Sequence, residues 1–333
     1  MVLMNVHWQG FHYIGRKTRD NVRKEMETIL HELENVISGK TTVIQKILMA
    51  MLAGGHVLMD DVPGVGKTTL AIALGKVMGL ASSRIQFTPD VLPSDIVGFS
   101  IYNKETGSFE YKPGVVVGTN LLLGDEINRT SSKTQSAFLE AMEEHQVTVD
   151  GVAHLLEKPF IVLATQNNVG TAGTQLLPYA QLDRFMACVS LGYPDHISQM
   201  DLLRKRQNAN PLDAVHPVLS LKQVLQMQKE IQAITAKDSI LEYISRLAIA
   251  TRAHDGVQVG LSPRSALHLD RMAKACAYLQ ERDYVIPEDV RTVFPDVGTH
   301  RIIVTPNARM SGIKPEQVLS DVLKSIPVPD WKQ

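Results

Sequence analysis

Short apolar runs alternate with amphipathic segments along the first two thirds of the chain. Apolar residues recur at helical spacing over residues 20–39, 43–52 and 68–78. Other apolar runs predict short strands, namely His56–Met59, Arg84–Thr88, Asn120–Leu123, Phe160–Thr165 and Ala187–Leu191. Because buried strands that alternate with helices are typical of a parallel sheet flanked by helices, the pattern predicts an α/β fold.

Two segments interrupt this pattern and predict hairpins. The first lies between residues 93 and 113, where Phe99–Tyr102 is expected to pair with Phe109–Tyr111. The second spans about residues 146–158 and contains Asp150-Gly151, the sequence that a two-residue hairpin turn favours. We therefore expect two small antiparallel insertions in the α/β domain.

Strand signals fade after Tyr193, and helical patterns dominate the remainder. Pro287 suits the first turn of a helix, and another apolar stripe consists of Leu269, Met272, Cys276 and Leu279. We therefore predict an α/β domain over residues 1–193 and a helical domain over residues 194–333.

The composition is that of a soluble globular protein. The 333 residues are 44% apolar and 21% charged, with a net charge of −1, which disfavours nucleic-acid binding. Cys188 and Cys276 match neither a disulfide framework nor a metal site. The sequence contains no signal-peptide core and no apolar run of about 18 residues. We therefore expect a cytoplasmic protein without membrane insertion.

The first chemical motif is a phosphate-binding loop after the first strand. It consists of Asp61, Val62, Pro63, Gly64, Val65, Gly66, Lys67, Thr68 and Thr69. Asp61 stands where the motif has its first glycine, and we expect Asp to be tolerated because it adopts a positive φ more readily than most residues. Lys67 would reach the phosphates of a nucleoside triphosphate, and Thr68 would ligate magnesium.

The second motif is a pair of carboxylates, Asp125 and Glu126, directly after an apolar strand. A carboxylate at the end of a buried strand is costly unless it serves a cation. Asp125 therefore suits a magnesium role, and Glu126 suits the base that orients an attacking water. The alternative is a pair of merely solvated acids.

Three further polar residues are candidates for the same site. Asn167 follows the fourth strand at the sheet edge where ligands bind, although it could be an ordinary turn residue. Arg184 could pair with Asp183 or reach the nucleotide of a neighbouring subunit. Arg264, in the first turn of a helix that Ser262 begins, opposes the helix dipole and so requires an anionic partner such as a phosphate between the domains. An ordinary surface arginine is the alternative.

Together these motifs resemble the AAA+ ATPases, and specifically the MoxR family. The resemblance is densest over residues 84–192, in Arg84–Ile96, Asp125–Arg129, Lys133–Glu144, Gln146–Gly151, Ala164–Asn167 and Ala180–Phe185. It implies a P-loop NTPase αβα sandwich with a parallel sheet, followed by a small all-α lid domain. The chain departs from the family at Gly124, where alanine is usual, at Ser131-Ser132, where a pair of prolines is usual, and over Asn168–Thr174, where a proline and acidic residues are common.

The resemblance also implies a role for each candidate residue. Lys67 and Thr68 would belong to Walker A, Asp125 and Glu126 to Walker B, Asn167 to sensor 1, Arg184 to the arginine finger and Arg264 to sensor 2. Arg129 is a second candidate for an arginine that acts on a neighbouring subunit. The hairpins would be the helix-2 insert and the pre-sensor-1 insert. Family members are thought to form hexameric rings, to remodel proteins as chaperones do, and to have partners with a von Willebrand factor A domain.

The leading prediction is therefore magnesium-dependent ATP hydrolysis at a subunit interface. A nucleotide-gated assembly module that hydrolyses little is the first alternative, and the intact Glu126 disfavours it. A DNA-directed motor is the second, and the mixed charges over residues 93–113 disfavour it. The sequence contains no N-K-x-D segment, which disfavours a GTPase.

Overall fold

The computed structural model describes residues 19–166, 177–207 and 210–330. Its centre is a parallel sheet of five strands in the order β2-β5-β8-β1-β9. These strands are β1 Val57–Asp60, β2 Ser82–Gln86, β5 Leu121–Asp125, β8 Ile161–Gln166 and β9 Ala187–Val189. The predicted parallel α/β architecture is confirmed. Three of the strands run further into polar residues than the apolar pattern indicates, because the backbones of Asp60, Asp125 and Gln166 still pair within or at the end of the sheet.

The two faces of the sheet contact two separate apolar cores. Alternate residues of a strand point to opposite faces, so Val57 and Met59 lie in one core and Leu58 lies in the other. The helices on the first face include α1 Arg19–Val36, α2 Thr41–Leu52 and α3 Lys67–Val77. Helix α5, Ser132–Glu144, covers the second face.

Helix α5 explains the first two departures from the family pattern, and the third, Asn168–Thr174, lies outside the described residues. Ser131 is the N-cap of α5, and its hydroxyl accepts a hydrogen bond from the Thr134 amide at 3.3 Å. A Cβ atom at Gly124 would lie 3.1 Å from the rings of both Phe87 and Phe138, which pack edge to face. The sheet therefore approaches α5 closely at this point.

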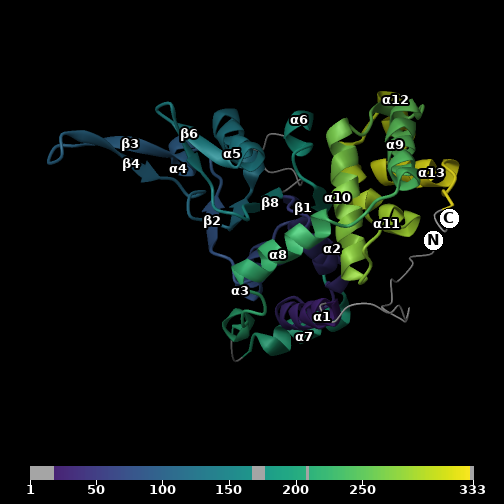
Figure 1. Cartoon of the computed structure of the whole chain (residues 1–333), viewed down its shortest axis with the longest axis horizontal. Helices are drawn as coiled ribbons and strands as arrows, with labels where there is room; N and C mark the ends of the chain where they lie inside the picture. Colours follow the sequence, from purple (N-terminus) through teal and green to yellow (C-terminus); the bar gives the residue numbers. More distant parts are fainter. Residues whose placement is uncertain (1–18, 167–176, 208–209, 331–333) are drawn as a thin grey trace.

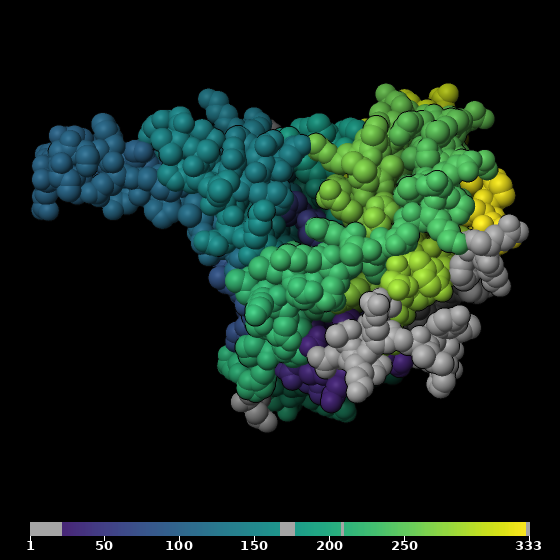
Figure 2. Space-filling model, viewed as in Figure 1, coloured from purple at the N-terminus to yellow at the C-terminus, as the bar shows by residue number. Residues whose placement is uncertain are grey.

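The two predicted hairpins are present, and the longer one projects from the body of the molecule (Figures 1 and 2). It pairs β3, Gly98–Asn103, with β4, Ser108–Pro113. The expected insertion near 93–113 begins with a short helix, α4 Pro93–Val97, because Pro93 occupies its first turn. The second hairpin pairs β6, Gln146–Val149, with β7, Val152–Leu155.

The C-terminal part is helical except for one small sheet. Its helices are α7 His196–Lys205, α8 Leu221–Gln232, α9 Asp238–Ala253, α10 Pro263–Leu279, α11 Pro287–Gly298, α12 Pro306–Met310 and α13 Pro315–Ser325. Strands β10, Val257–Val259, and β11, Ile303–Val304, form an antiparallel pair that the sequence patterns did not predict. Within the described ranges, no helix is long and apolar enough to cross a membrane.

The helical part shares a core with the sheet domain. The apolar residues of α8, α10 and α11 belong to the cluster that also contains α1, α2 and α3. Helix α7 lies against α1, where Lys205 donates to the carbonyl of Glu34 at 3.2 Å. The domain boundary near residue 193 stays a prediction.

His56, directly before β1, links three parts of the sheet domain through a buried ring. Its Nε2 donates to the carbonyl of Met142 at 3.0 Å, and its Nδ1 accepts from the amide of Val162 at 3.0 Å. Burial lowers the pKa of His56 from 6.5 to about 4. The ring is therefore neutral in the folded protein at pH 6, whereas in the unfolded chain it is largely protonated.

This difference predicts acid destabilisation that depends on His56. Below pH 6.5 the unfolded state binds more protons, so the free energy of unfolding falls by up to about 1.4 kcal/mol per pH unit towards pH 4. His56→Gln retains a donor and an acceptor but does not titrate, and we expect a shallower pH dependence. Urea unfolding between pH 4.5 and 7.5 measures the slope, with the exposed His216→Gln as control. If the free energy of unfolding depends on pH equally in wild type and His56→Gln, His56 does not cause the acid destabilisation.

Candidate functional site

The phosphate-binding loop connects β1 with α3 and relies on two glycines. Gly64 and Gly66 have φ values of 83° and 95°, a region that L-residues with side chains rarely adopt. A Cβ atom at Gly66 would also lie 2.9 Å from the side chain of Ile37. Helix α3 begins at Lys67, so its amides and the positive end of its dipole face the loop. The loop therefore has the geometry of an anion site.

Asp61 is accommodated for a different reason from the one predicted. It is not among the residues with positive φ, so the expectation of a left-handed backbone there was wrong. Its carboxylate accepts from the amide of Gly192 at 2.7 Å and from the hydroxyl of Ser190 at 3.1 Å. It also accepts from the amide of Val62 at 2.9 Å. Asp61 thus ties the start of the loop to the segment after β9.

Lys67 lies across the mouth of the loop. Its ammonium group donates to the carbonyl of Asp61 at 2.9 Å and to the carbonyl of Gln166 at 3.3 Å. Burial lowers the pKa of Lys67, while nearby carboxylates, with Asp61 foremost, oppose that shift. The positive charge therefore lies where the carboxyl ends of β1 and β8 meet, which is the ligand edge of a parallel sheet.

Asp125 and Thr68, the two residues that the sequence assigns to magnesium, lie in contact in the structure. The Thr68 hydroxyl donates to the Asp125 carboxylate at 3.2 Å, and Arg84 donates to the same oxygen at 2.7 Å. The other oxygen of Asp125 accepts from the Thr165 hydroxyl at 3.3 Å. Asp125 is only 4% exposed, so this carboxylate depends on these donors. A hydroxyl beside a buried carboxylate is a donor set that suits a hard cation such as magnesium.

Glu126 is held by its backbone and by its side chain. Its φ of 56° costs about 1–3 kcal/mol for a residue other than glycine, and its amide donates to the Thr165 hydroxyl at 2.9 Å. Its carboxylate accepts from Gln86 at 3.1 Å and from Arg129 at 2.6 Å. Arg129, the second candidate for an arginine that acts on a neighbour, thus contacts Glu126 of its own chain.

Arg84 and Gln86 are site residues that sequence reasoning had not assigned. Both lie on β2, two positions apart, and so they share one face of that strand. Their pairing with β5 places Gln86 opposite Asp125. One signal could have identified Arg84 and Gln86. They are polar residues at alternate positions of a strand that lies next to the strand with the carboxylates.

The structure brings Arg184 and Arg264 together, on one carboxylate. Arg184 donates to Glu143 at 2.8 Å, and Arg264 donates to the other oxygen of Glu143. The two arginines lower the pKa of Glu143, chiefly through the hydrogen bond from Arg184. The anionic partner of Arg264 in this structure is therefore Glu143. Asp183, the alternative partner considered for Arg184, pairs instead with Arg301.

These arginines lie away from the phosphate loop of the same chain. They line a cavity of about 230 Å³ together with His56 and Met186. His56 directly precedes β1 and Met186 directly precedes β9, so the cavity lies at the amino ends of these strands. The phosphate loop follows the carboxyl end of β1 and lies at the opposite edge. Asn167 lies outside the described residues.

Comparison with known proteins agrees with this geometry. Residues 56–187 match the ATPase family associated with various cellular activities (AAA), and residues 249–322 match the AAA lid domain. The chain is 46% identical to the uncharacterised protein YeaC of Bacillus subtilis, over 90% of this chain and 93% of that protein. It is 37% identical to chaperone MoxR1 of Mycobacterium tuberculosis, over 91% of this chain and 82% of that protein.

A solved structure shows the same arrangement of the chain. The crystal structure of a candidate ATPase from Cytophaga hutchinsonii superposes with a TM-score of 0.86 at 38% identity. The match covers 94% of this chain and 98% of that one. The matches to the AAA domain and to the lid domain, and the share of the chain that the relatives cover, identify the family. The chain belongs to the MoxR family of AAA+ ATPases.

Proposed function

We propose that the protein is a magnesium-dependent ATP hydrolase whose site is completed by a neighbouring copy in a ring of six. The observation that carries this proposal is the place of Arg184 and Arg264, at the sheet edge opposite the phosphate loop. The four residues of β1 alone separate the two edges by about 13 Å at a rise of about 3.3 Å per residue. The two arginines are therefore better placed to contact a nucleotide on the next subunit.

The residues of the phosphate loop suit binding and orientation of the triphosphate. The loop amides and Lys67 bind the phosphates, and Thr68 and Asp125 would hold magnesium. A bound magnesium ion would neutralise charge on the β- and γ-phosphates. Glu126 orients the attacking water and accepts its proton, while Gln86 and Arg129 keep the carboxylate in place. Arg184 and Arg264 of the neighbour would stabilise charge on the transferred phosphoryl group.

The projecting hairpin supports chaperone-like remodelling of partner proteins. Four of its apolar side chains are exposed, with Phe109 at 74%, and the others are Phe99, Ile101 and Tyr102. Apolar side chains that gather on a projecting element are typical of a protein contact surface. The relative from Mycobacterium tuberculosis is named a chaperone, which agrees with this role. A partner with a von Willebrand factor A domain is the part of the proposal that comes from the family resemblance, and a cytoplasmic location remains a prediction from the sequence.

The alternatives are less well supported by the same residues. The projecting hairpin offers little positive charge for nucleic-acid binding, because its Lys112 is paired with Glu110 at 3.9 Å. A nucleotide-gated module without hydrolysis has no use for the strained, doubly held Glu126. Neither observation favours DNA-directed or purely regulatory activity.

Replacement of the base tests the hydrolytic role. Glu126→Gln is expected to reduce turnover by about 10²–10⁴, the contribution of general acid–base catalysis, while ATP still binds. Phosphate release and the affinity for a fluorescent ATP analogue measure the two effects separately. Glu140→Gln, on the exposed face of α5, is the matched control and should retain full turnover. Unchanged turnover of Glu126→Gln would exclude Glu126 as the base.

A mixing experiment tests whether the arginine acts across the interface. Arg184→Ala is expected to lower turnover by about 10³-fold or more, as loss of an arginine finger does. Mixing Arg184→Ala with Glu126→Gln subunits should restore activity, since about one quarter of the sites in a random ring combine an intact site with an intact neighbour. Lys67→Ala mixed with Glu126→Gln should not recover, because both changes lie in the same half-site. If the mixture of Arg184→Ala and Glu126→Gln subunits does not regain turnover, the proposed subunit interface is contradicted.

A further inference from the structure

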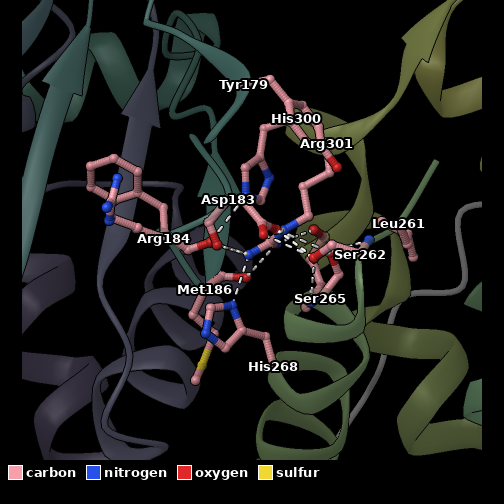
Figure 3. A network of polar contacts seen from close by, with 12 residues as sticks. Tyr179, Asp183, Arg184, Met186, Leu261, Ser262, Ser265, His268, His300 and Arg301 are labelled. Atoms are coloured by element: carbon pink, nitrogen blue, oxygen red, sulfur yellow. Dashed lines mark hydrogen bonds and ion pairs between the residues drawn. The ribbon is translucent and has the colours of Figure 1, made fainter. Parts of the chain in front are cut away.

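We infer that the buried Arg301 is a positioning residue that fixes Arg184 and Arg264 relative to one another across the junction of the lid and the sheet domain. The inference rests on the proposed function, in which both arginines act on the neighbouring nucleotide. In this inference Arg301 acts through these two arginines and not on the nucleotide itself. Its contacts lie on both sides of Arg184 in the chain and at the start of the helix that carries Arg264 (Figure 3).

The guanidinium group of Arg301 holds the backbone that flanks Arg184. Arg301 is fully buried at the end of the short helix η3, Thr299–Arg301. It donates to the carbonyl of Asp183 at 2.9 Å, to that of Phe185 at 2.6 Å and to that of Met186 at 3.3 Å. The residue before Arg184 and the two residues after it are thus bound to one rigid group. Figure 3 shows Arg184 itself pointing away from these contacts.

The same guanidinium group reaches the helix of Arg264 through Asp183. Arg301 donates to the Asp183 carboxylate at 2.8 Å, and the hydroxyls of Ser262 and Ser265 donate to that carboxylate at 2.9 and 3.2 Å. Ser262 is the N-cap of α10, two residues before Arg264. Asp183 therefore links the Arg184 segment to the first turn of α10.

A third link joins Arg301 to the second turn of α10. The Nδ1 atom of His268 accepts from Arg301 at 2.7 Å. Burial, together with the charge of Arg301, lowers the pKa of His268 to about 2, so the ring stays neutral and can accept. Arg264 and His268 are four residues apart and lie on the same side of the helix. Arg301 thus holds the stretch of α10 that presents Arg264.

Arginine is the side chain that these contacts require. Its planar group offers five donors in fixed directions, and here they meet carbonyls, a carboxylate and an imidazole. Lysine would retain the charge but would offer three donors from a single point and could not hold the same set. A buried ion pair alone contributes little net stability. Because the acceptors of Arg301 include the carbonyls that flank Arg184, we conclude that Arg301 positions the catalytic arginines.

The experiment replaces Arg301 with lysine and separates binding from turnover. Because a displacement of about 1 Å at a reacting group costs about 100-fold, we expect Arg301→Lys to lower kcat by about 10- to 100-fold. KM and the affinity for a fluorescent ATP analogue should stay at the wild-type values, since the phosphate loop is untouched. Mixing with Glu126→Gln subunits should restore turnover, because these subunits supply correctly placed arginines.

A second buried pair in the lid provides the matched control. Arg282 donates to Asp289, which is 1% exposed, and it follows the last turn of α10, whereas Arg264 lies in the first turn of that helix. Arg282→Lys should lower the unfolding temperature without changing kcat of the folded protein. Equal loss of kcat in Arg282→Lys and Arg301→Lys would show a general effect of lid destabilisation and would overturn the inference.

Three further outcomes decide the remaining cases. If Arg301→Lys does not fold, Ser265→Ala takes its place, because it removes one hydroxyl that donates to Asp183. We expect Ser265→Ala to lower kcat and mixing with Glu126→Gln subunits to restore it. A wild-type kcat for Ser265→Ala would then overturn the inference. If the mixture with Arg184→Ala recovers but the mixture with folded Arg301→Lys does not, Arg301 does not act through the arginines. If neither mixture recovers, the proposed interface is wrong, and the inference about Arg301 fails with it.

Discussion

The direction of β1 is the constraint on which the rest of the site depends. In a parallel sheet the carboxyl ends of all strands meet at one edge, and that edge here gathers Lys67, Asp125 and Glu126. The amino end of the same strand begins beside Arg184, at the other edge. One rigid strand thus separates the phosphate loop from Arg184 and Arg264. In the proposed ring, each subunit would therefore contribute to two different nucleotide sites.

The buried charged side chains have different kinds of partner at the two edges of the sheet. At the edge with the phosphate loop, Asp125 accepts hydrogen bonds from the hydroxyls of Thr68 and Thr165 and from Arg84. At the opposite edge, Arg301 is surrounded by acceptors from its own chain. Arg184 and Arg264 fall between these cases, since both contact the single carboxylate of Glu143. Their partner is partly exposed, so they can exchange it for a phosphate at less cost than a buried pair.

Local patterns were sufficient to predict the five strands of the parallel sheet, the loop between β1 and α3, and the two hairpins, and they assigned Thr68 and Asp125 to the same site. Each of these features depends on residues close in sequence or on the shared edge of a parallel sheet. The reason that Asp61 is tolerated was not visible in the local sequence, because its partners Ser190 and Gly192 follow β9, 129 and 131 positions away. Arg301 could not be predicted, since it contacts Asp183 across 118 positions and nothing local marks it. The pairing of Glu143 with Arg264 across 121 positions was hidden in the same way.

The most direct measurement is a structure of the Glu126→Gln protein with ATP and magnesium, determined by electron cryomicroscopy of the assembled particle. We expect Arg184 and Arg264 to leave Glu143 and to lie within hydrogen-bonding distance of the γ-phosphate of the adjacent subunit. Arg301 should keep its contacts with Asp183 and His268. ATP-bound subunits in which both arginines remain on Glu143, with no arginine of a neighbour near the phosphates, would contradict the account.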